Sequence, residues 1–386
     1  MLTLSTTLHT FAMVEVFAIP AMAPAMAHGL GVRESLVGGQ VLVVYFAAMI
    51  SSMFSGSLVA RIGIVRATRL SLAGSGLGLG FAAIPSVAVT VVASALLGVS
   101  YGLANPATGA MLEGAAPPGR RAVLFSIKQS AVPIGGVIAG VLAPFLTVLV
   151  GWQRALLAIA ALSIAGVLLL EVTRDWFPIS EKHSARHGGR MAGDISLILD
   201  VTALKYTCLA GAVFAGVQLV LTTYLVPMLV RHTGLSLVAA GIGLSCFNAG
   251  GFCGRFAWGL TADAIKSGAL ALSLAVGVAV AMLLALPFVR PDWPIALIYF
   301  FLAVLGFVAA GWNGVFVSEI VRLAPGGDAA RAIAGAFVFS FAGALTGVAC
   351  FLLGTQWLDD YGSAIWMLSC MSIVGFLLSL KAFSAS

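Results

Sequence analysis

Two basic side chains, Lys128 and Arg255, lie within long apolar segments that carry no other charge. A cation at the centre of a membrane helix costs at least ~2.5–3.5 kcal/mol on insertion scales, and it persists where it faces a protein interior or a watery cavity. A carboxylate would satisfy both side chains, because Arg255 can bind it in bidentate fashion and Lys128 can act as a point charge. The two cations therefore predict a binding site for a small organic anion.

Structural roles for the same two cations stay open. The long stem of Lys128 could reach the cytoplasmic interface by snorkelling, which would leave its charge outside the cavity. Arg255 could form a structural pair with Glu319 or with backbone carbonyl groups.

Glu15 is the only acidic residue in the middle of an apolar segment. Burial favours the neutral form of a carboxyl group, so Glu15 is a candidate proton carrier. It could instead form a permanent ion pair with Lys128 or Arg255, or have a peripheral role.

Six uncharged polar residues could complete the cavity, although each of them alone is more often a helix–helix contact than a ligand. Asn248 lies two turns before Arg255 on the same helical face. Tyr101 and Asn105 share a face through their i,i+4 spacing. The six residues are Tyr101, Asn105, Gln129, Gln218, Asn248 and Asn313.

The composition places the chain in lipid. Of its 386 residues 61% are hydrophobic and only 9% are charged, whereas soluble domains carry roughly 25% charged residues. The net charge of +6 comes from residues between apolar segments and forms no stripe for nucleic acid. The five cysteines form no disulfide or zinc pattern, and the sequence contains no phosphate-binding loop or nucleophile–base set, so we expect no enzyme, cofactor or metal site.

Twelve apolar segments are long enough to span a bilayer, which needs ~20 residues. They cover residues 5–28, 38–60, 69–86, 88–112, 123–149, 154–172, 203–228, 237–260, 268–289, 294–320, 332–356 and 362–381. The longest polar stretch follows the sixth segment. The sequence therefore predicts an all-α membrane protein with a six-helix bundle at 1–172, a cytoplasmic linker at 173–202 and a second six-helix bundle at 203–386.

Basic residues predict the orientation, since cytoplasmic loops are enriched in Lys and Arg. With a cytoplasmic N-terminus, fourteen of the twenty basic residues lie in inner loops and four in outer loops, and the other two are Lys128 and Arg255. Both termini are expected to be cytoplasmic. The short loops suit a bacterial inner membrane.

The two halves resemble each other. A shift of 208 residues aligns two positions in the fourth and tenth segments and three in the loops after them: Gly98 with Gly306, Asn105 with Asn313, Ala116 with Ala324, Pro117 with Pro325 and Gly119 with Gly327. Such matches at equivalent places indicate a duplicated six-helix unit, a common transporter design.

The loop after the second segment reads GSLVARIGIVR, from Gly56 to Arg66. It resembles the G-x-L-x-D-R-x-G-R-[KR] signature of the major facilitator superfamily, and the stretch Gly259–Asp263 occupies the equivalent place in the second half. The resemblance implies twelve helices, transport by alternating access, a cavity lined by helices 1, 4, 7 and 10, and helices 5 and 8 side by side.

A group of residues near the cytoplasmic helix ends resembles the conformational latch of that superfamily. We expect the two glycines to allow close helix approach and the charged residues to form ion pairs. Solvated interfacial charges are the alternative. The group contains Gly56, Arg61, Glu113, Gly259, Asp263, Glu319 and Arg331.

Several positions depart from the family patterns. Ala60 replaces the acidic residue of the signature, and Gly98 stands where many proton-coupled drug exporters have an arginine. The spacing of Arg255 from Gly259 and Asp263 is similar to the eighth helix of the monocarboxylate and oxalate–formate transporter families. Gly251 stands where those symporters often carry an aspartate, so their proton coupling is not implied.

These observations favour a secondary transporter for a small organic anion, with proton coupling open. A proton-driven exporter of hydrophobic or cationic compounds is the first alternative, and a membrane sensor or scaffold without transport is the second. The expected partners are an anionic small molecule and the lipid bilayer, without nucleic acid, and the expected state is a monomer.

Overall fold

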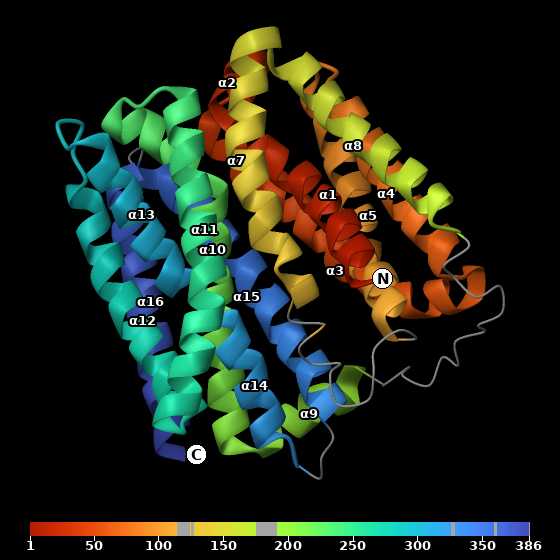
Figure 1. Ribbon diagram of the computed structural model, residues 1–386. Coiled ribbons are helices and arrows are strands. Elements are labelled where there is room, and N and C mark those ends of the chain that lie inside the picture. Colours follow the sequence, from red (N-terminus) through yellow and green to blue (C-terminus); the bar gives the residue numbers. More distant parts are fainter. Residues whose placement is uncertain (114–123, 125–126, 175–190, 326–328, 359–360, 386) are drawn as a thin grey trace. The chain divides into compact units, whose positions relative to one another are not determined.

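The structure is a computed structural model whose regular elements are all helices in the part it describes (Figure 1). It describes residues 1–113, 124, 127–174, 191–325, 329–358 and 361–385, with the side chains of 113, 191–194, 329–331, 334, 358 and 361–363 left aside. The chain forms two compact units: Met1–Gly188 with Leu237–Ser245 (unit 1), and Gly189–Ser236 with Cys246–Ser386 (unit 2).

Eleven helical segments in the described part are long and apolar enough to cross a membrane. The third expected segment, 69–86, corresponds to α4 (Ile64–Ala82), which includes Arg66 and Arg69 at its start and is not among the eleven. The eleven segments and α4 together match the twelve segments expected from the sequence. Many large apolar side chains remain exposed on these helices, as lipid-facing surfaces require.

Unit 1 contains the helices of the first half of the chain. Besides α4, they are α1 (Leu2–Ala21), α2 (Ala23–Leu30), the 3-10 turn η1 (Glu34–Leu36), α3 (Val37–Ile62), α5 (Val87–Glu113), α7 (Ala131–Val150) and α8 (Trp152–Val172). Residues 127–129 form a helical turn before α7. The first turns of α11 (Leu237–Ile265) also pack in unit 1, where the Ser245 hydroxyl donates to the carbonyl of Val137 in α7 at 2.8 Å.

Hydroxyl groups bind neighbouring helices in unit 1 where the helical backbone leaves carbonyls free. Pro106 of α5 lacks an N–H, so the Gly102 carbonyl loses its helical partner. The Ser55 hydroxyl of α3 donates to that carbonyl at 2.9 Å. This bond satisfies a buried polar group and joins α3 to α5.

The contacts between helices also show their directions. α8 runs antiparallel to α1 and to α4, because residues later in those helices meet residues earlier in α8. The contacting pairs are Phe11 with Gly166, Glu15 with Ser163, Leu72 with Gly166, and Gly76 with Ser163. α5 is antiparallel to α4 in the same way, with Ser71 against Ser100 and Gly78 against Leu97. It follows that α1 and α5 are antiparallel.

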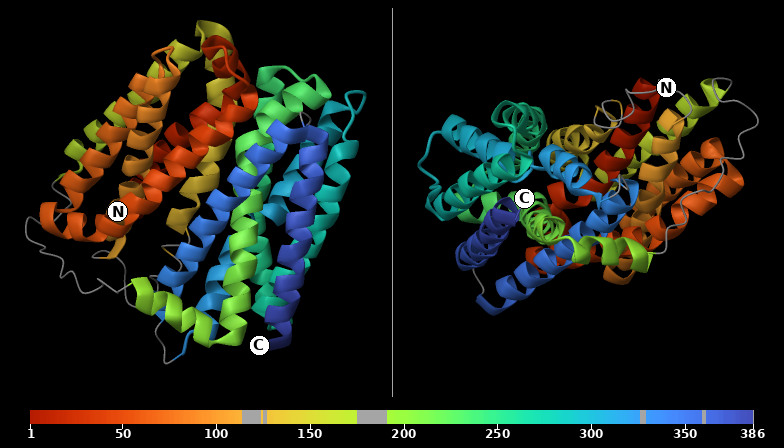
Figure 2. Two further views of the ribbon diagram at one scale, coloured as in Figure 1. Left: turned by 180° about the vertical axis from the view of Figure 1, so that it is seen from behind. Right: turned by 90° about the horizontal axis from the view of Figure 1, so that it is seen from below.

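Unit 2 contains the helices of the second half. Besides most of α11, they are α9 (Met191–Asp200), α10 (Thr202–Thr233), α12 (Gly268–Ala285), η3 (Leu286–Phe288), α13 (Ile295–Ala309), α14 (Asn313–Leu323), α15 (Ala329–Leu358) and α16 (Tyr361–Ala385). Within this unit α10 packs against both α15 and α16, and α12 packs against α16 (Figure 2). The sequence did not predict α9, which lies within the expected linker.

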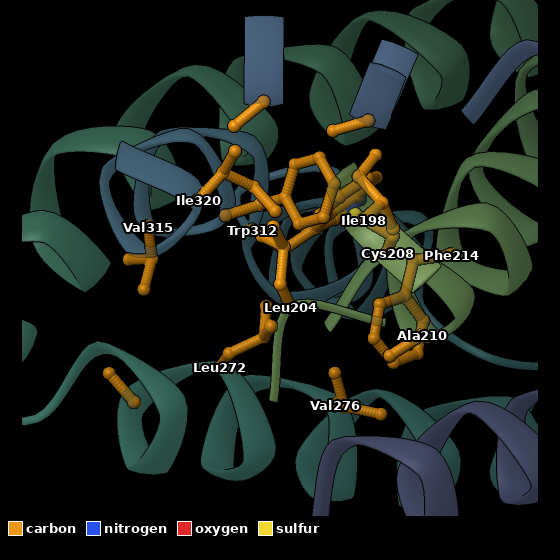
Figure 3. Close-up of a cluster of buried hydrophobic side chains, with 14 residues drawn as sticks. Ile198, Leu204, Cys208, Ala210, Phe214, Leu272, Val276, Trp312, Val315 and Ile320 are labelled. Carbon is orange, nitrogen blue, oxygen red and sulfur yellow. The ribbon is translucent and has the colours of Figure 1, made fainter. Parts of the chain in front are cut away.

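A buried apolar cluster joins five helices of unit 2: α9, α10, α12, α14 and α15 (Figure 3). Ile198 comes from α9, Phe214 from α10 and Leu272 from α12, and the Trp312 ring just before α14 lies among them. The Trp312 ring meets the rings of Phe214 and Phe316 edge-on at centroid distances of 5.7 and 5.1 Å. This packing holds Trp312 and its neighbour Asn313 in place.

The expected tenth segment is not one continuous helix. α13 ends at Ala309, and the helical pattern breaks at residues 310–312 before α14 begins at Asn313. A side chain at Gly311 would collide with the Phe307 carbonyl and with Gly254, so only glycine fits this close approach. Broken helices at membrane depth are tolerated where protein or a cavity surrounds them, and they commonly mark transporter sites.

The two glycines of the expected latch have open space around them within their own units, among the described residues. A Cβ atom added at Gly56 or Gly259 meets no described atom within 4 Å. Close approach occurs instead along α11, where a Cβ at Gly250 or Gly254 would collide with the backbone of α13 at Ala303 or Phe307. A packing role for Gly56 and Gly259 stays a prediction, because neither glycine contacts another helix within its own unit.

The tight packing at Gly254 and the open space at Gly259 predict different effects of alanine on the thermal stability of the protein. Gly254→Ala should lower the thermal midpoint of the purified protein, because overpacking against a rigid backbone costs about 1–3 kcal/mol. Gly259→Ala should leave the midpoint unchanged or raise it, since alanine is the better helix former by up to about 1 kcal/mol. Thermal unfolding in detergent measures both, and equal midpoints for the two variants would contradict the packing assignment.

Candidate functional site

The Lys128 side chain is buried in unit 1, with 1% of its surface exposed. Its ammonium group donates to the side-chain oxygen of Asn105 at 2.5 Å and to the backbone oxygen of the same residue at 3.1 Å. No carboxylate pairs with Lys128 among the described residues. Lys128 therefore does not snorkel in this structure, and among the described residues its charge is held by two neutral oxygens of α5.

Asn105 connects this buried ammonium with accessible surface. Unlike Lys128, Asn105 is exposed, and it lies one turn after Tyr101 on α5. The Tyr101 ring meets the Tyr45 ring of α3 edge-on, with centroids 5.8 Å apart. Gln129, next to Lys128, is half-buried. The structure thus joins Lys128, Asn105 and Tyr101 in one region of unit 1, as the i,i+4 spacing on α5 suggested.

His9 of α1 belongs to the same region, and sequence reasoning missed it. The ring is 1% exposed, and neither ring nitrogen has a hydrogen-bond partner among the described residues. Lys128 lies within electrostatic reach of the imidazole. A histidine inside an apolar first span was a usable signal, because a buried polar ring without a partner is uncommon.

Glu15 is buried between α1, α4 and α8, away from any cation. The Ser163 hydroxyl lies 2.5 Å from one Glu15 carboxyl oxygen and 2.6 Å from the Leu72 carbonyl oxygen. A hydroxyl group has one proton, so it can donate to only one of these acceptors at a time. When Glu15 is protonated it can donate to Ser163, which then donates to Leu72. When Glu15 is ionised, the Ser163 hydroxyl can turn toward it.

Glu15 forms no ion pair with Lys128 among the described residues of unit 1. The second carboxyl oxygen of Glu15 has no hydrogen-bond partner there. Ser75 of α4 is a second hydroxyl group near this carboxyl group, but a permanently charged carboxylate buried in such a place would need a cation or several strong donors to offset its loss of solvation. The geometry therefore fits a group that gains and loses a proton.

Unit 2 brings together two of its predicted site residues. The Gln218 side-chain oxygen accepts hydrogen bonds from the Asn313 amide at 3.0 Å and from the Trp312 indole at 3.1 Å. The break between α13 and α14 places both donors beside α10. The internal match of Asn105 with Asn313 thus corresponds to a polar site residue in each unit.

Asn248 and Arg255 lie on α11 in unit 2. Asn248 is buried and Arg255 is half-buried. Glu319, the proposed structural partner of Arg255, pairs with Arg322 through contacts of 2.6 and 2.9 Å. Arg255 remains a candidate ligand on the basis of its position in an apolar helix.

The charged residues of the expected latch have different surroundings. Arg61 and Asp263 are exposed, and neither forms an ion pair with a described residue. Glu319 is 1% exposed and lies against Gly268 at the start of α12, where a carboxylate interacts favourably with the helix dipole. The side chains of Glu113 and Arg331 lie outside the described part.

The chemistry available to this arrangement is binding and proton transfer. Within the described residues, no group of three His, Cys, Asp or Glu side chains could hold a metal ion. A buried ammonium, a buried imidazole and a buried carboxyl group can bind an anion and carry a proton. Amide groups in unit 2 can orient a polar ligand.

Comparison with known proteins identifies relatives along most of the chain. The family described as the Major Facilitator Superfamily matches residues 4–348. The purine ribonucleoside efflux pump NepI of Escherichia coli is 27% identical over 244 residues, which cover 61% of this chain and 59% of the pump. The same pump of Shigella sonnei is 25% identical over a similar stretch. The chain spans about three fifths of the length of these curated relatives.

Solved structures with the same fold have much lower sequence identity. A bacterial homolog of the human lysosomal transporter Spinster, inward-facing and unoccupied, has a TM-score of 0.77 at 14% identity and covers 100% of this chain and 97% of its own. A D-xylose–proton symporter has a TM-score of 0.73 at 16% identity, covering 98% and 95%. These likenesses concern the fold alone.

Proposed function

We propose that this chain moves a small organic anion by alternating access. The chain belongs to the major facilitator superfamily, and it is a membrane transporter, not an enzyme. The observation that supports the proposal is the buried Lys128 ammonium, whose acceptors among the described residues are the two oxygens of Asn105. An ammonium group has three donors, so one N–H remains for a ligand. A substrate carboxylate would neutralise this charge, which Asn105 cannot do.

The other proposed substrate ligands lie on helices that line the cavity in this superfamily, next to Lys128 in the chain, or on Arg255's own helix. In unit 1 they are Tyr101, Asn105 and Gln129, and in unit 2 they are Gln218, Asn248, Arg255 and Asn313. Glu15 is the proposed proton carrier. We further propose two six-helix halves, 1–172 and 203–386, joined by a linker at 173–202, with both termini cytoplasmic in a bacterial inner membrane.

A second candidate is the efflux of a neutral, hydrogen-bonding metabolite such as a purine nucleoside. Two observations favour it: the relatives named as purine ribonucleoside efflux pumps, and the amide pair of Gln218 and Asn313. Amide side chains bind the donor and acceptor edges of nucleobases well. Export of cations is disfavoured, since Lys128 would repel them.

Uptake into proteoliposomes separates these candidates. Purified protein is reconstituted and supplied with a labelled monocarboxylate, a labelled dicarboxylate or a labelled purine nucleoside under the same ion gradients. Accumulation of a carboxylate above that in protein-free vesicles supports the anion. If the nucleoside accumulates and neither carboxylate does, the second candidate function replaces anion transport.

Arg255→Ala is expected to weaken carboxylate transport in this assay, raising KM by about 10–100-fold, because hydrogen bonds to charged groups contribute about 1.5–3 kcal/mol. Arg290→Ala is the matched control, since Arg290 is exposed and lies outside the regular helices. Equal KM values for wild type and Arg255→Ala would show that Arg255 does not bind the substrate.

A further inference from the structure

We propose that His9 is a substrate ligand that lies beside Lys128 and selects carboxylates with a second hydrogen-bonding group next to the carboxylate. This inference rests on the proposed anion transport and deepens it. It concerns a residue in unit 1 alone.

The level of His9 follows from the contact between α1 and α5. The Ser5 hydroxyl of α1 donates to the Thr108 carbonyl of α5 at 2.6 Å. The two helices are antiparallel, so later residues on α1 meet earlier residues on α5. His9 lies four residues after Ser5, and Asn105 lies three residues before Thr108. Both are displaced by about one turn, roughly 5 Å, in the same direction, which brings His9 level with Asn105 and its bound Lys128.

Unsatisfied hydrogen-bonding groups then converge at this level. A neutral imidazole offers one N–H donor and one nitrogen acceptor, and both nitrogens of His9 are buried without a partner among the described residues. Lys128 has one further N–H. A single carboxylate could accept from Lys128, but it has no proton for the acceptor nitrogen of His9. A carboxylate with a neighbouring hydroxyl group supplies both an acceptor and a donor.

A ligand can approach His9 and Lys128 from the side of α5. Asn105 is exposed although the Lys128 ammonium bound to it is buried. A ligand that reaches Asn105 is therefore one side chain away from Lys128. Leu4 and Leu8, which precede His9 on α1, pack with Met111 of α5 in an apolar cluster.

The inference is tested by binding of paired ligands to the purified full-length protein. Butyrate, 2-hydroxybutyrate and 3-hydroxybutyrate are compared by isothermal titration in detergent. Wild type should bind 2-hydroxybutyrate about three to ten times more tightly than butyrate, the effect of one or two hydrogen bonds. His9→Phe should lose this ratio and keep its affinity for butyrate. His9→Gln, which retains a donor and an acceptor, should keep at least part of the ratio.

Lys128→Met provides the contrasting pattern, because it should weaken all three ligands by the same factor. If His9→Phe binds all ligands as wild type does, His9 is a buried structural residue and the inference is overturned. If His9→Phe weakens all three equally, His9 only positions Lys128 and the inference is again overturned. If none of the three binds wild type, the proposed anion transport fails together with the role of His9. Binding of all three at equal affinity overturns the role of His9 alone.

Discussion

Replacing Lys128 by methionine is expected to remove carboxylate transport while leaving the protein at least as stable as wild type. The ammonium is buried, and its partners in the described part of the chain are neutral. Its hydrogen bond to a charged substrate would contribute about 1.5–3 kcal/mol, so affinity should fall by about 10–100-fold. Methionine has a similar length and no charge to bury, and apolar replacement of buried charges is often neutral or stabilising.

The opposite signs of these two effects make the experiment informative. Substrate uptake in proteoliposomes and thermal unfolding in detergent are measured on the same preparation. A snorkelling or structural lysine would show the reverse pattern, with transport retained or with the thermal midpoint lowered. Lys381→Met is the matched control, since Lys381 is exposed on α16 and near the ring of Tyr206. It should change neither measurement.

The chemistry of Lys128 could be predicted from sequence, but its partner could not. A lone cation in an apolar segment stands out because lipid excludes charge. Its partner Asn105 lies 23 residues earlier in the chain, and only the packing of α5 against the turn before α7 brings them together. His9 was missed for the same reason. Its position on α1 becomes meaningful once the Ser5–Thr108 contact gives the register of α1 against α5.

The helices themselves were largely predictable, because a bilayer requires apolar segments of known length. The break at residues 310–312 was not, since its sequence is as apolar as the helices on either side. Packing decides it: Gly311 lies against Phe307 and Gly254, which leaves no room for a side chain. The motif at Gly56 and Gly259 identified the family without revealing which glycines bring helices together. Small residues are common in such chains, and sequence alone does not show which of them face another backbone.

Glu15→Gln is expected to abolish uptake driven by a pH gradient and to leave substrate exchange intact. Glutamine keeps the size and a hydrogen-bonding oxygen for Ser163, yet it cannot gain or lose a proton. Exchange of internal for external substrate needs no net proton movement, so it should continue at the wild-type rate. Both are measured in proteoliposomes, with a pH gradient in one set and preloaded unlabelled substrate in the other.

Glu171→Gln is the control for this prediction. Glu171 of α8 pairs with Arg69 of α4 near the surface, and exposed pairs contribute at most about 1 kcal/mol. This variant should retain both activities. Loss of both activities in Glu15→Gln would identify Glu15 as a structural residue, and retention of both would leave it without a role in coupling.

Ser163 explains why a proton on Glu15 could influence packing. Its hydroxyl reaches both the Glu15 carboxyl group of α1 and the Leu72 carbonyl of α4. Deprotonation of Glu15 turns the hydroxyl toward α1 and breaks its bond to α4. Gly76 allows the close contact of Ser163 with α4, since a Cβ there would lie 2.7 Å from the Ser163 side chain. The proton on Glu15 would thus decide whether three helices of unit 1 share one hydrogen-bonded chain. Ser163→Ala should therefore keep exchange but weaken the response to the pH gradient, because the carboxyl group stays while its link to α4 is lost.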